Sequence, residues 1–323
     1  MTRAILISSC GEPLLASFCI ELLKKNSWDE FDTLYICFNN YAEAPTEAQA
    51  EFMAKYINDP KIRIIYWPSQ LGYGRPIAKM LAVCEEDLIC LLEDDGFIVK
   101  PGALDTEFKK IESGEFDALG SPRFSCGQEI AEALKQKYKL DYSGYGDKGP
   151  NFWPNFFFCK RADLLKTDLD FGPHGFEKGQ VYHELDHKME NAEAGDTFVW
   201  TSIQLRYLGL KIGEIPQNHS DPYDIDLFEK KEGKWAEDGP SYIHGGSLSS
   251  VKYWKGDLPN VEAEISKFEI ESRVAWWLIV SDSVSGFSEY NESFHQGVHT
   301  LIENAGLDIT RINKKLEIYE ELL

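Results

Sequence analysis

The stretch that decides the fold runs from Asp87 to Gly102 and reads DLICLLEDDGFIVKPG. Its five apolar residues, 88–92, are typical of a strand that is buried on both faces. Three carboxylates, those of Glu93, Asp94 and Asp95, follow this strand directly. Carboxylates placed so close together repel one another unless a cation joins them.

This acidic tripeptide predicts a metal site at the end of a sheet. Hard divalent ions take oxygen ligands, and Mg²⁺ is typically held by one or two carboxylates together with substrate phosphates. Open α/β sheets bind their ligands at the carboxyl ends of the strands. We therefore infer a metal-bridged phosphate ligand at this position. An acidic turn that only ends the strand is the alternative that the tripeptide leaves open.

The chain around this stretch alternates between strands and helices. Strands are expected over residues 4–8, 33–38, 61–67, 118–124, 155–159 and 211–215, and helices over 13–25, 45–57, 75–84, 103–111 and 197–208. The regular alternation before residue 101 predicts a mostly parallel sheet with helices on both of its faces. The fold class is therefore α/β.

The domain boundaries follow from changes in composition. Residues 1–257 are expected to form the α/β domain. Within it, residues 217–246 are polar and too long for an ordinary connection, so we expect a functional or mobile loop there. Residues 258–323 predict a helical C-terminal region. Its apolar segment, 276–280, is expected to pack on the main domain or to form a contact in a homodimer.

Composition excludes several classes of protein. The 323 residues are 43% apolar and 27% charged, as in a soluble globular protein, and no apolar run approaches the ~18 residues of a membrane helix. Seven scattered cysteines without a Cys-x-x-Cys pair are typical of reduced core residues in a cytoplasmic protein. A net charge of −21 opposes binding to phosphate backbones. It disfavours a nucleic-acid partner, although a local basic patch would still permit one.

Two blocks of sequence resemble GT-A fold glycosyltransferases, most closely those of the family 2 type. In the first, QLGYGRPIA (residues 70–78) and a helix precede the strand LLEDD (91–95) and the turn PGAL (101–104). The order is that of the family's glycine-containing loop, helix, apolar strand and D-x-D-like motif. In the second, residues 195–212 resemble the family's Glu-Asp motif, which opens a helix and is followed by Gly-aromatic-Lys and a strand.

The resemblance spans roughly residues 3–220 and implies a Rossmann-like GT-A domain. It also implies a nucleotide-sugar donor, for which a UDP-sugar is the expected compound, and a divalent metal, Mn²⁺ or Mg²⁺. The reaction it implies is transfer of the sugar to an acceptor nucleophile, usually a hydroxyl group.

The resemblance implies roles for the acidic tripeptide. Asp95, helped by Glu93, would hold the metal that neutralises the departing pyrophosphate. Alternation along the strand puts Asp94 on the other side, where the resemblance implies contact with hydroxyl groups of the donor. A histidine often completes the metal site in such enzymes. His244, which two glycines follow, is the preferred candidate, and His219 is the alternative.

Asp196 is the candidate base for the acceptor hydroxyl. It lies at the start of a predicted helix, where the helix dipole favours a carboxylate, although an ordinary N-cap would occupy the same position. Gly195 stands where the family has Glu, so Glu184 and Asp186 stay open as substitutes. A base of this kind favours inversion over retention at the sugar.

Donor-binding candidates lie after the first two strands and in the glycine loop. They are Ser8, Ser9, Glu12, Asn39, Asn40, Gly72 and Arg75. In family 2 the second strand usually ends in an acidic residue that holds uracil or ribose. Here it ends in two asparagines, whose amides both donate and accept hydrogen bonds, so the base of the donor stays open.

Aromatic residues are the candidates for the acceptor side. Trp153 lies between Asn151 and Pro154. Trp235 and Tyr242 are expected to close over the donor as part of the long loop. The acceptor itself is unidentified: a saccharide, a protein side chain, a small metabolite, or a hydroxymethylated pyrimidine of viral DNA, which would have to be extruded from the duplex.

Other functions stay open as alternatives. Nucleotidyltransferases share a related sheet and metal chemistry, but they usually open with a Gly-rich loop that bears Arg or Lys. A lectin-like module would not need the acidic strand end. Residues 183–187, HELDH, match the H-E-x-x-H signature of zinc proteases, in which both histidines lie on one face of a helix. The charges of Asp186 and Lys188 do not suit that motif, so a zinc hydrolase is the most remote alternative.

Overall fold

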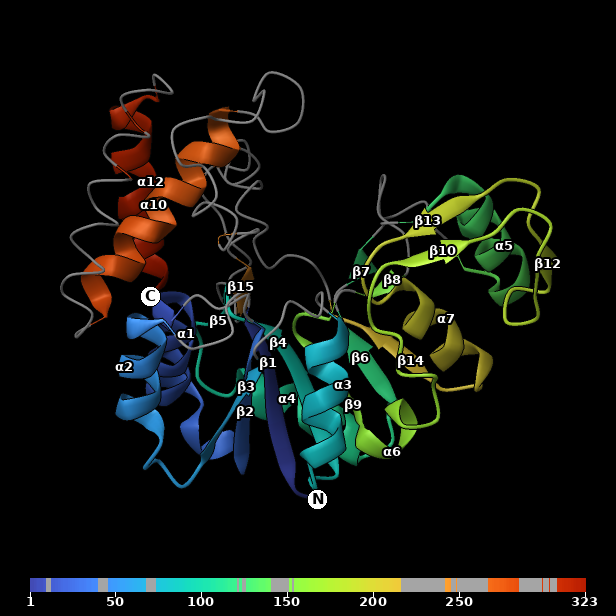
Figure 1. The fold of residues 1–323 in the computed structure, drawn as a ribbon, viewed down its shortest axis with the longest axis horizontal. Helices are drawn as coiled ribbons and strands as arrows, with labels where there is room; N and C mark the ends of the chain where they lie inside the picture. The colour runs from blue at the N-terminus through green and yellow to red at the C-terminus, as the bar shows by residue number, and fades with distance from the viewer. Residues whose placement is uncertain are drawn as a thin grey trace.

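The fold is built on one seven-stranded sheet. The computed structural model describes residues 1–9, 13–39, 46–67, 74–120, 122–123, 126–140, 151–152, 154–215, 242–244, 248, 267–284, 298, 302 and 307–323. Across the sheet the strand order is β14-β6-β9-β4-β1-β2-β3 (Figure 1). In chain order the strands are β1 (Arg3–Ser9), β2 (Thr33–Asn39), β3 (Ile62–Trp67), β4 (Leu88–Glu93), β6 (Ala118–Gly120), β9 (Phe157–Lys160) and β14 (Ile212–Glu214).

The sheet is parallel except at one strand. β1 lies between β2 and β4 and is parallel to both, and β2 continues the parallel order to β3. β9 is the exception, because it is inserted antiparallel between β4 and β6. The parallel strands β4, β1 and β2 therefore present their carboxyl ends at one edge of the sheet.

Helices cover both faces of the sheet, as alternation along the strands requires. Ile5 and Ile7 of β1 join a core with side chains of α1, α2, α4 and α10. Ala4 and Leu6 point to the opposite face and join a core with α3, α6 and α7. The helices are α1 (Pro13–Asn26), α2 (Glu47–Tyr56), α3 (Gly74–Val83), α4 (Ala103–Glu112), α5 (Gln128–Tyr138), α6 (Arg161–Leu164), α7 (Val199–Tyr207), α10 (Lys267–Ser283) and α12 (Ile309–Leu322), with a 3₁₀ turn, η1 (Trp28–Glu30).

The predicted fold class is confirmed. The strands and helices expected before residue 112 are all present, with ends within two residues of the predicted ones. The strand expected over 118–124 is instead divided between β6 and β7 (Pro122–Arg123), and β7 pairs with β8 (Asn151–Phe152) outside the main sheet. Within the described residues, no helix combines the length and the apolar composition that a membrane span requires.

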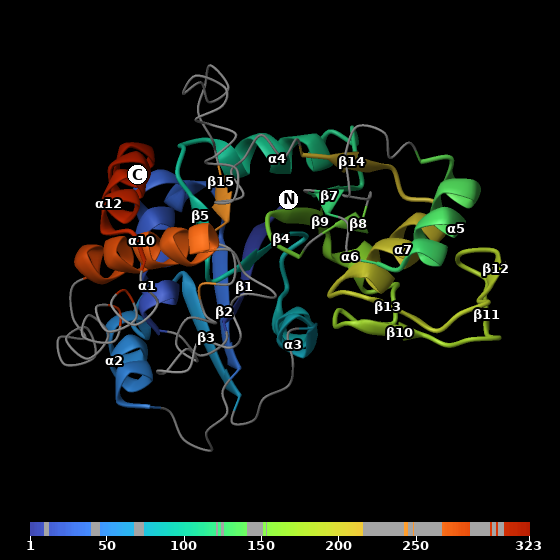
Figure 2. The same cartoon turned by 90° about the horizontal axis from the view of Figure 1, so that it is seen from above.

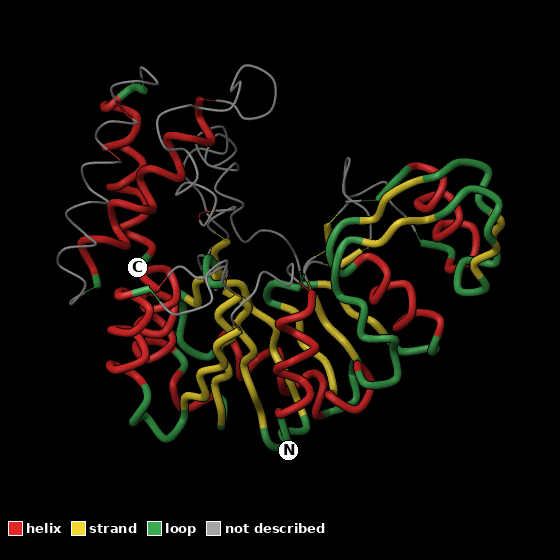
Figure 3. Tube along the Cα trace, viewed as in Figure 1, coloured by secondary structure: helices red, strands yellow, loops and turns green. Residues whose placement is uncertain are grey.

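A lobe made mainly of residues 126–195 was not predicted. It contains α5 and two short antiparallel ribbons, β10 (His174–Phe176) with β13 (Glu193–Gly195) and β11 (Val181–Tyr182) with β12 (His187–Lys188). Figure 3 shows how much of this lobe is loop and turn. It is held by a core of its own, which it shares with α7 and which includes Ile130, Phe176, Trp200 and Ile203.

The zinc-hydrolase alternative is wrong, because HELDH is not helical. His183 to Asp186 form the turn of the β11–β12 hairpin, and His187 begins β12. Asp186 has a φ of 52°, which no α-helix contains. His187 instead faces Glu129 of α5, with its Nε2 2.7 Å from Oε1. The two histidines therefore do not share the face of a helix.

The C-terminal region packs on the main domain. α10 and α12 stand beside α1, next to β5 (Gly96–Ile98) and β15 (Tyr242–His244), in both views of Figures 1 and 2. Trp276 and Trp277 are fully buried in the single chain. These two side chains therefore pack within one chain, as expected, and the homodimer contact of residues 276–280 stays a prediction. Apart from β15, the expected loop 217–246 lies outside the described residues, and the boundary at 257 stays a prediction.

The start of α3 packs closely against the backbone of Phe171 and Gly172, which are distant in sequence. A Cβ atom on Gly74 would lie 2.2 Å from the nitrogen of Gly172 and 2.4 Å from the carbonyl carbon of Phe171. A backbone atom cannot move aside as the end of a side chain can. Glycine at 74 is therefore what allows α3 to contact the segment before β10.

We expect Gly74→Ala to lower the free energy of unfolding by about 1–3 kcal/mol, the usual cost of overpacking. Gly172→Ala is the matched control, because its Cβ would meet only Asp170 Oδ1, at 3.7 Å. The control should change stability by no more than ~0.5 kcal/mol. Urea unfolding of the two variants measures both values, and equal stabilities would contradict the contact.

Candidate active site

The acidic tripeptide lies at the carboxyl edge of the sheet, beside the end of β1. Residue 8 of β1 is in register with Glu93 at the end of β4. Ser9 Oγ donates a 2.6 Å hydrogen bond to Asp94 Oδ2, and both residues are buried. Two predicted donor-site residues, Ser9 and Asp94, are thus brought into contact.

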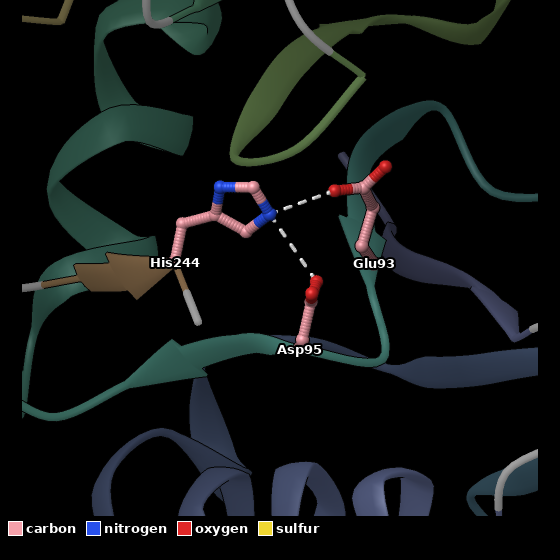
Figure 4. Close-up of side chains that lie close together, drawn as sticks. All are labelled: Glu93, Asp95 and His244. Carbon is pink, nitrogen blue, oxygen red and sulfur yellow. Dashed lines mark ion pairs between the residues drawn. The ribbon is translucent and has the colours of Figure 1, made fainter. Parts of the chain in front are cut away.

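Glu93, Asp95 and His244 converge on one point (Figure 4). His244 Nε2 lies 3.0 Å from Glu93 Oε2 and 3.3 Å from Asp95 Oδ1. The histidine arrives on β15, which pairs antiparallel with β5 and places residue 244 opposite Gly96. A Cβ at position 96 would lie 2.5 Å from Asn155 Oδ1, so glycine at this position leaves room for the Asn155 side chain.

His244 forms ion pairs with Glu93 and Asp95 in a buried place. Burial alone would lower the pKa of His244, but the carboxylates of Asp95 and Glu93 outweigh it and raise the pKa to about 10. Burial pushes the pKa of Asp95 upward, yet His244 and the N–H of Leu248 together hold that pKa below its ordinary value. Without a metal, the imidazolium is therefore the cation that the two carboxylates share.

Asn155 orients Glu93, a role that was not predicted from the sequence. Its Nδ2 donates to Glu93 Oε2 at 3.0 Å, and its Oδ1 accepts from the Glu93 N–H at 3.1 Å. The amide is buried, with 2% of its surface exposed. It lies 62 residues away in sequence, just before β9, so no local pattern around Glu93 points to it.

The three residues fit a divalent cation. Each offers one ligand atom, and these atoms all lie within 4.8 Å of one another. Carboxylate oxygens suit Mg²⁺ and Mn²⁺, and an imidazole nitrogen is a common additional ligand of transition metals. Two carboxylates and one neutral imidazole would give a bound ion a charge-compensating set of ligands.

The other predicted donor residues are dispersed around this edge. Ser8 and Asn39 are buried at the ends of β1 and β2, whereas Arg75 is exposed on the first turn of α3. Glu12, Asn40, Gly72, His219, Trp153 and Trp235 lie outside the described residues.

Tyr242 does not line an acceptor surface, contrary to the prediction. It belongs to β15, pairs with Ile98 and is only 4% exposed. Its ring stacks on that of Phe156, with the centroids 4.5 Å apart and the planes at 5°. Alternation along β15 explains the outcome, because the side chains of Tyr242 and His244 share one side of the strand and the tyrosine lies deeper in the core.

Asp196 lies between β13 and α7 and is half-buried. Its side chain accepts from the N–H of Thr197 at 2.7 Å, and α7 begins after Phe198 without a side-chain cap. The N-cap alternative is therefore wrong. A Cβ at Gly195 would lie 2.9 Å from Val199 Cγ1, so the glutamate of the family pattern does not fit there without movement.

The alternative bases lie elsewhere. Glu184 and Asp186 belong to the turn of the β11–β12 hairpin, at the outer end of the lobe and away from β4 and β15 in Figures 1 and 2. Their position does not favour either as a substitute for Asp196.

A pH-dependent stability should follow from the pKa of His244. The folded-state pKa of His244 is about 10, above the ordinary value of 6.5. Protonated His244 therefore makes its full contribution to the free energy of unfolding below pH 6.5. The stabilisation is lost as the pH rises through about 10. We therefore expect His244→Gln to destabilise the metal-free protein more at pH 6 than at pH 10, as measured by urea unfolding in EDTA. His183→Gln, in the exposed hairpin turn, is the control. A pH-independent difference between wild type and His244→Gln would contradict the ion pairing.

Several solved structures resemble this chain at low sequence identity. No curated protein matches it. TarS 1–349 of S. aureus, in complex with UDP, is 12% identical over 99% of this chain and 92% of that one, with a TM-score of 0.43. The mannosyltransferase PcManGT of Pyrobaculum calidifontis, in complex with GDP-Man and Mn²⁺, is 10% identical over 94% and 85%, with a TM-score of 0.44.

The glucosyl-3-phosphoglycerate synthase of Mycobacterium tuberculosis, in complex with Mn²⁺, UDP and glucosyl-3-phosphoglycerate, is similarly distant. It is 12% identical over 66% of this chain and 68% of that one, with a TM-score of 0.41.

A family model gives the decisive match. In contrast, the model described as glycosyl transferase family 2 matches residues 4–176, which is more than half of the sequence and includes the acidic tripeptide. The chain therefore belongs to glycosyl transferase family 2 and is a glycosyltransferase.

Proposed function

We propose that this enzyme uses Mn²⁺ or Mg²⁺ to transfer a sugar from a nucleotide-sugar donor, with a UDP-sugar expected, to an acceptor hydroxyl group. The observation that carries the proposal is the convergence of Glu93, Asp95 and His244 at the carboxyl end of β4. A divalent cation held by these residues would neutralise the charge that develops on the leaving diphosphate.

The chain's own residues would bind and orient the donor. Asp94 accepts from Ser9 on one oxygen, and a carboxylate has further lone pairs with which to accept from donor hydroxyls. Ser8, the penultimate residue of β1, and Asn39, the last residue of β2, lie at the carboxyl ends of their strands, where an open sheet binds a nucleotide. Arg75, exposed at the start of α3, is available to an anionic group. Glu12, Asn40 and Gly72 complete the proposed donor set.

Asp196 is the proposed base, and inversion at the sugar is the proposed stereochemical course. Its carboxylate is half-buried and does not cap α7, so a lone pair remains for the proton of an acceptor hydroxyl. Taking that proton as the sugar is transferred would make the acceptor oxygen a stronger nucleophile.

The acceptor is proposed only as a hydroxyl compound. Trp153 and Trp235 are the proposed acceptor-side contacts. The net charge of −21 argues against hydroxymethylated DNA as the acceptor. The six described cysteines are all buried free thiols, which supports a reducing compartment such as the cytoplasm.

The metal site is tested by removing its carboxylates. Asp95→Asn should lower transfer roughly 100-fold or more, because a catalytic metal contributes several kcal/mol. Glu93→Gln should act in the same direction. EDTA should abolish transfer by the wild type, and Mn²⁺ should restore it.

Thermal shift with a panel of nucleotide-sugars, with and without Mn²⁺, identifies the donor, since a bound ligand raises the unfolding temperature.

Glu85→Gln is the matched control for these variants, because Glu85 is an exposed acid just before β4. It should retain wild-type activity and metal response. Full, EDTA-resistant activity in Asp95→Asn would sink the metal-dependent mechanism.

The base is tested by Asp196→Asn. We expect transfer to fall by about 10²–10⁴-fold, the usual contribution of a general base, with unchanged binding of metal and donor by calorimetry. Glu184→Gln and Asp186→Asn serve as controls and should keep their activity. If one of them is inactive instead and Asp196→Asn is active, the base has been assigned to the wrong residue.

A further inference from the structure

The helix α10 is buried to an unusual degree for a helix at the margin of a domain. All eight residues from 270 to 277 are buried, including the polar Glu271, Ser272 and Arg273. A surface helix buries a single apolar stripe, whereas α10 buries two full turns on every side. It therefore contacts more than one part of the molecule.

One of these contacts leads to the metal site. Trp277 Nε1 donates a 2.9 Å hydrogen bond to the carbonyl oxygen of Leu248, and both side chains are fully buried. The N–H of Leu248 in turn donates to Asp95 Oδ2 at 3.0 Å. The backbone of one residue thus accepts from α10 on one side and donates to the acidic tripeptide on the other.

This arrangement divides the two oxygens of Asp95 between two tasks. Oδ2 is occupied by the Leu248 N–H, and Oδ1 faces His244 Nε2 at 3.3 Å. A carboxylate held by one oxygen keeps the other in a fixed direction. Glu93 is held differently, because Asn155 Nδ2 donates to Oε2, the same oxygen that faces His244 Nε2. Each of the two carboxylates nevertheless has a fixed hydrogen-bond partner of its own. Partners of this kind typically change metal affinity 10–100-fold when they are removed.

We propose that Trp277 is a positioning residue of the metal site, acting through the backbone of Leu248 on the carboxylate of Asp95. The inference rests on the proposed metal dependence of the enzyme. It makes α10, outside the residues that the family model matches, a functional part of the active site. The indole N–H holds the Leu248 backbone at the distance at which it can donate to Oδ2.

The test measures metal binding directly. Trp277→Phe removes the indole N–H and keeps an aromatic ring, and titration with Mn²⁺ followed by electron paramagnetic resonance gives the Kd without any turnover. We expect the Kd to rise roughly 10-fold. In assays, the KM for Mn²⁺ should rise by a similar factor, while kcat at saturating Mn²⁺ stays near the wild-type value.

Trp276→Phe is the matched control on the same helix. Trp276 is equally buried, but its Nε1 has no hydrogen-bond partner within the described part of the chain. Its ring stacks on Tyr319 of α12, with the centroids 4.2 Å apart. This variant should lose stability through packing and yet bind Mn²⁺ within about twofold of the wild type, a smaller change than the loss of a group that orients a metal ligand produces.

If Trp277→Phe does not fold, the tryptophan at 277 can be replaced by benzothienylalanine, which has nearly the same shape and lacks the N–H donor. The same 10-fold rise in Kd is expected. An unchanged Kd in either folded variant, or an equal rise in Trp276→Phe, would overturn the positioning role while leaving the proposed function intact. Failure of the wild type to bind Mn²⁺, with or without a nucleotide-sugar, would overturn the metal assignment and this inference together.

Discussion

Backbone hydrogen bonds between β5 and β15 hold His244 against the end of β4, and the site exists only because of this pairing. β4 ends at Glu93 and is followed directly by Asp94 and Asp95, and the first basic residue after them is Lys100, beyond β5. The register that sets residue 244 opposite Gly96 brings an imidazole within 3.0–3.3 Å of two of them. A shift of one residue would turn the histidine to the other side of the strand, since side chains alternate.

The net charge of the buried groups that this pairing brings together favours a bound cation. Two carboxylates and one imidazolium leave a net negative charge in a buried place, and burying an uncompensated charge is costly. The protein reduces this cost with fixed donors: Asn155 for Glu93, Leu248 for Asp95 and Ser9 for Asp94. The same donors fix the directions of the carboxylates, so the hydrogen bonds that stabilise the buried charges also set their geometry.

The sheet could be predicted from the sequence because its strands are continuous apolar runs, which burial on both faces requires. The acidic tripeptide and His244 could also be named, since residue type and a family resemblance pointed to them. The lobe of residues 126–195 could not, because its two-residue and three-residue strands are too short for a periodic pattern. HELDH was misleading for a related reason: the pattern of letters does not record that Asp186 takes a left-handed conformation in a hairpin turn.

The groups that orient Glu93 and Asp95 were beyond prediction as well. Asn155 lies 62 residues from Glu93, and Trp277 reaches Asp95 through a backbone group rather than a side chain. Neither has a local signature, since an asparagine before an aromatic strand and a tryptophan in an apolar helix are common in any core. Tyr242 was misassigned because its depth in the core depends on the stack with Phe156, which only the tertiary structure contains.

The distance along the chain between β4 and its partners also sets an order of events during synthesis. Leu248 follows Asp95 by 153 residues, an interval on the order of ten seconds at ~5–20 residues per second. Throughout that time the parallel strands can assemble, while the carboxylates at their edge have neither histidine nor backbone donor. The growing chain therefore emerges from the ribosome with an acidic, unfinished edge, and the last third of the sequence completes it.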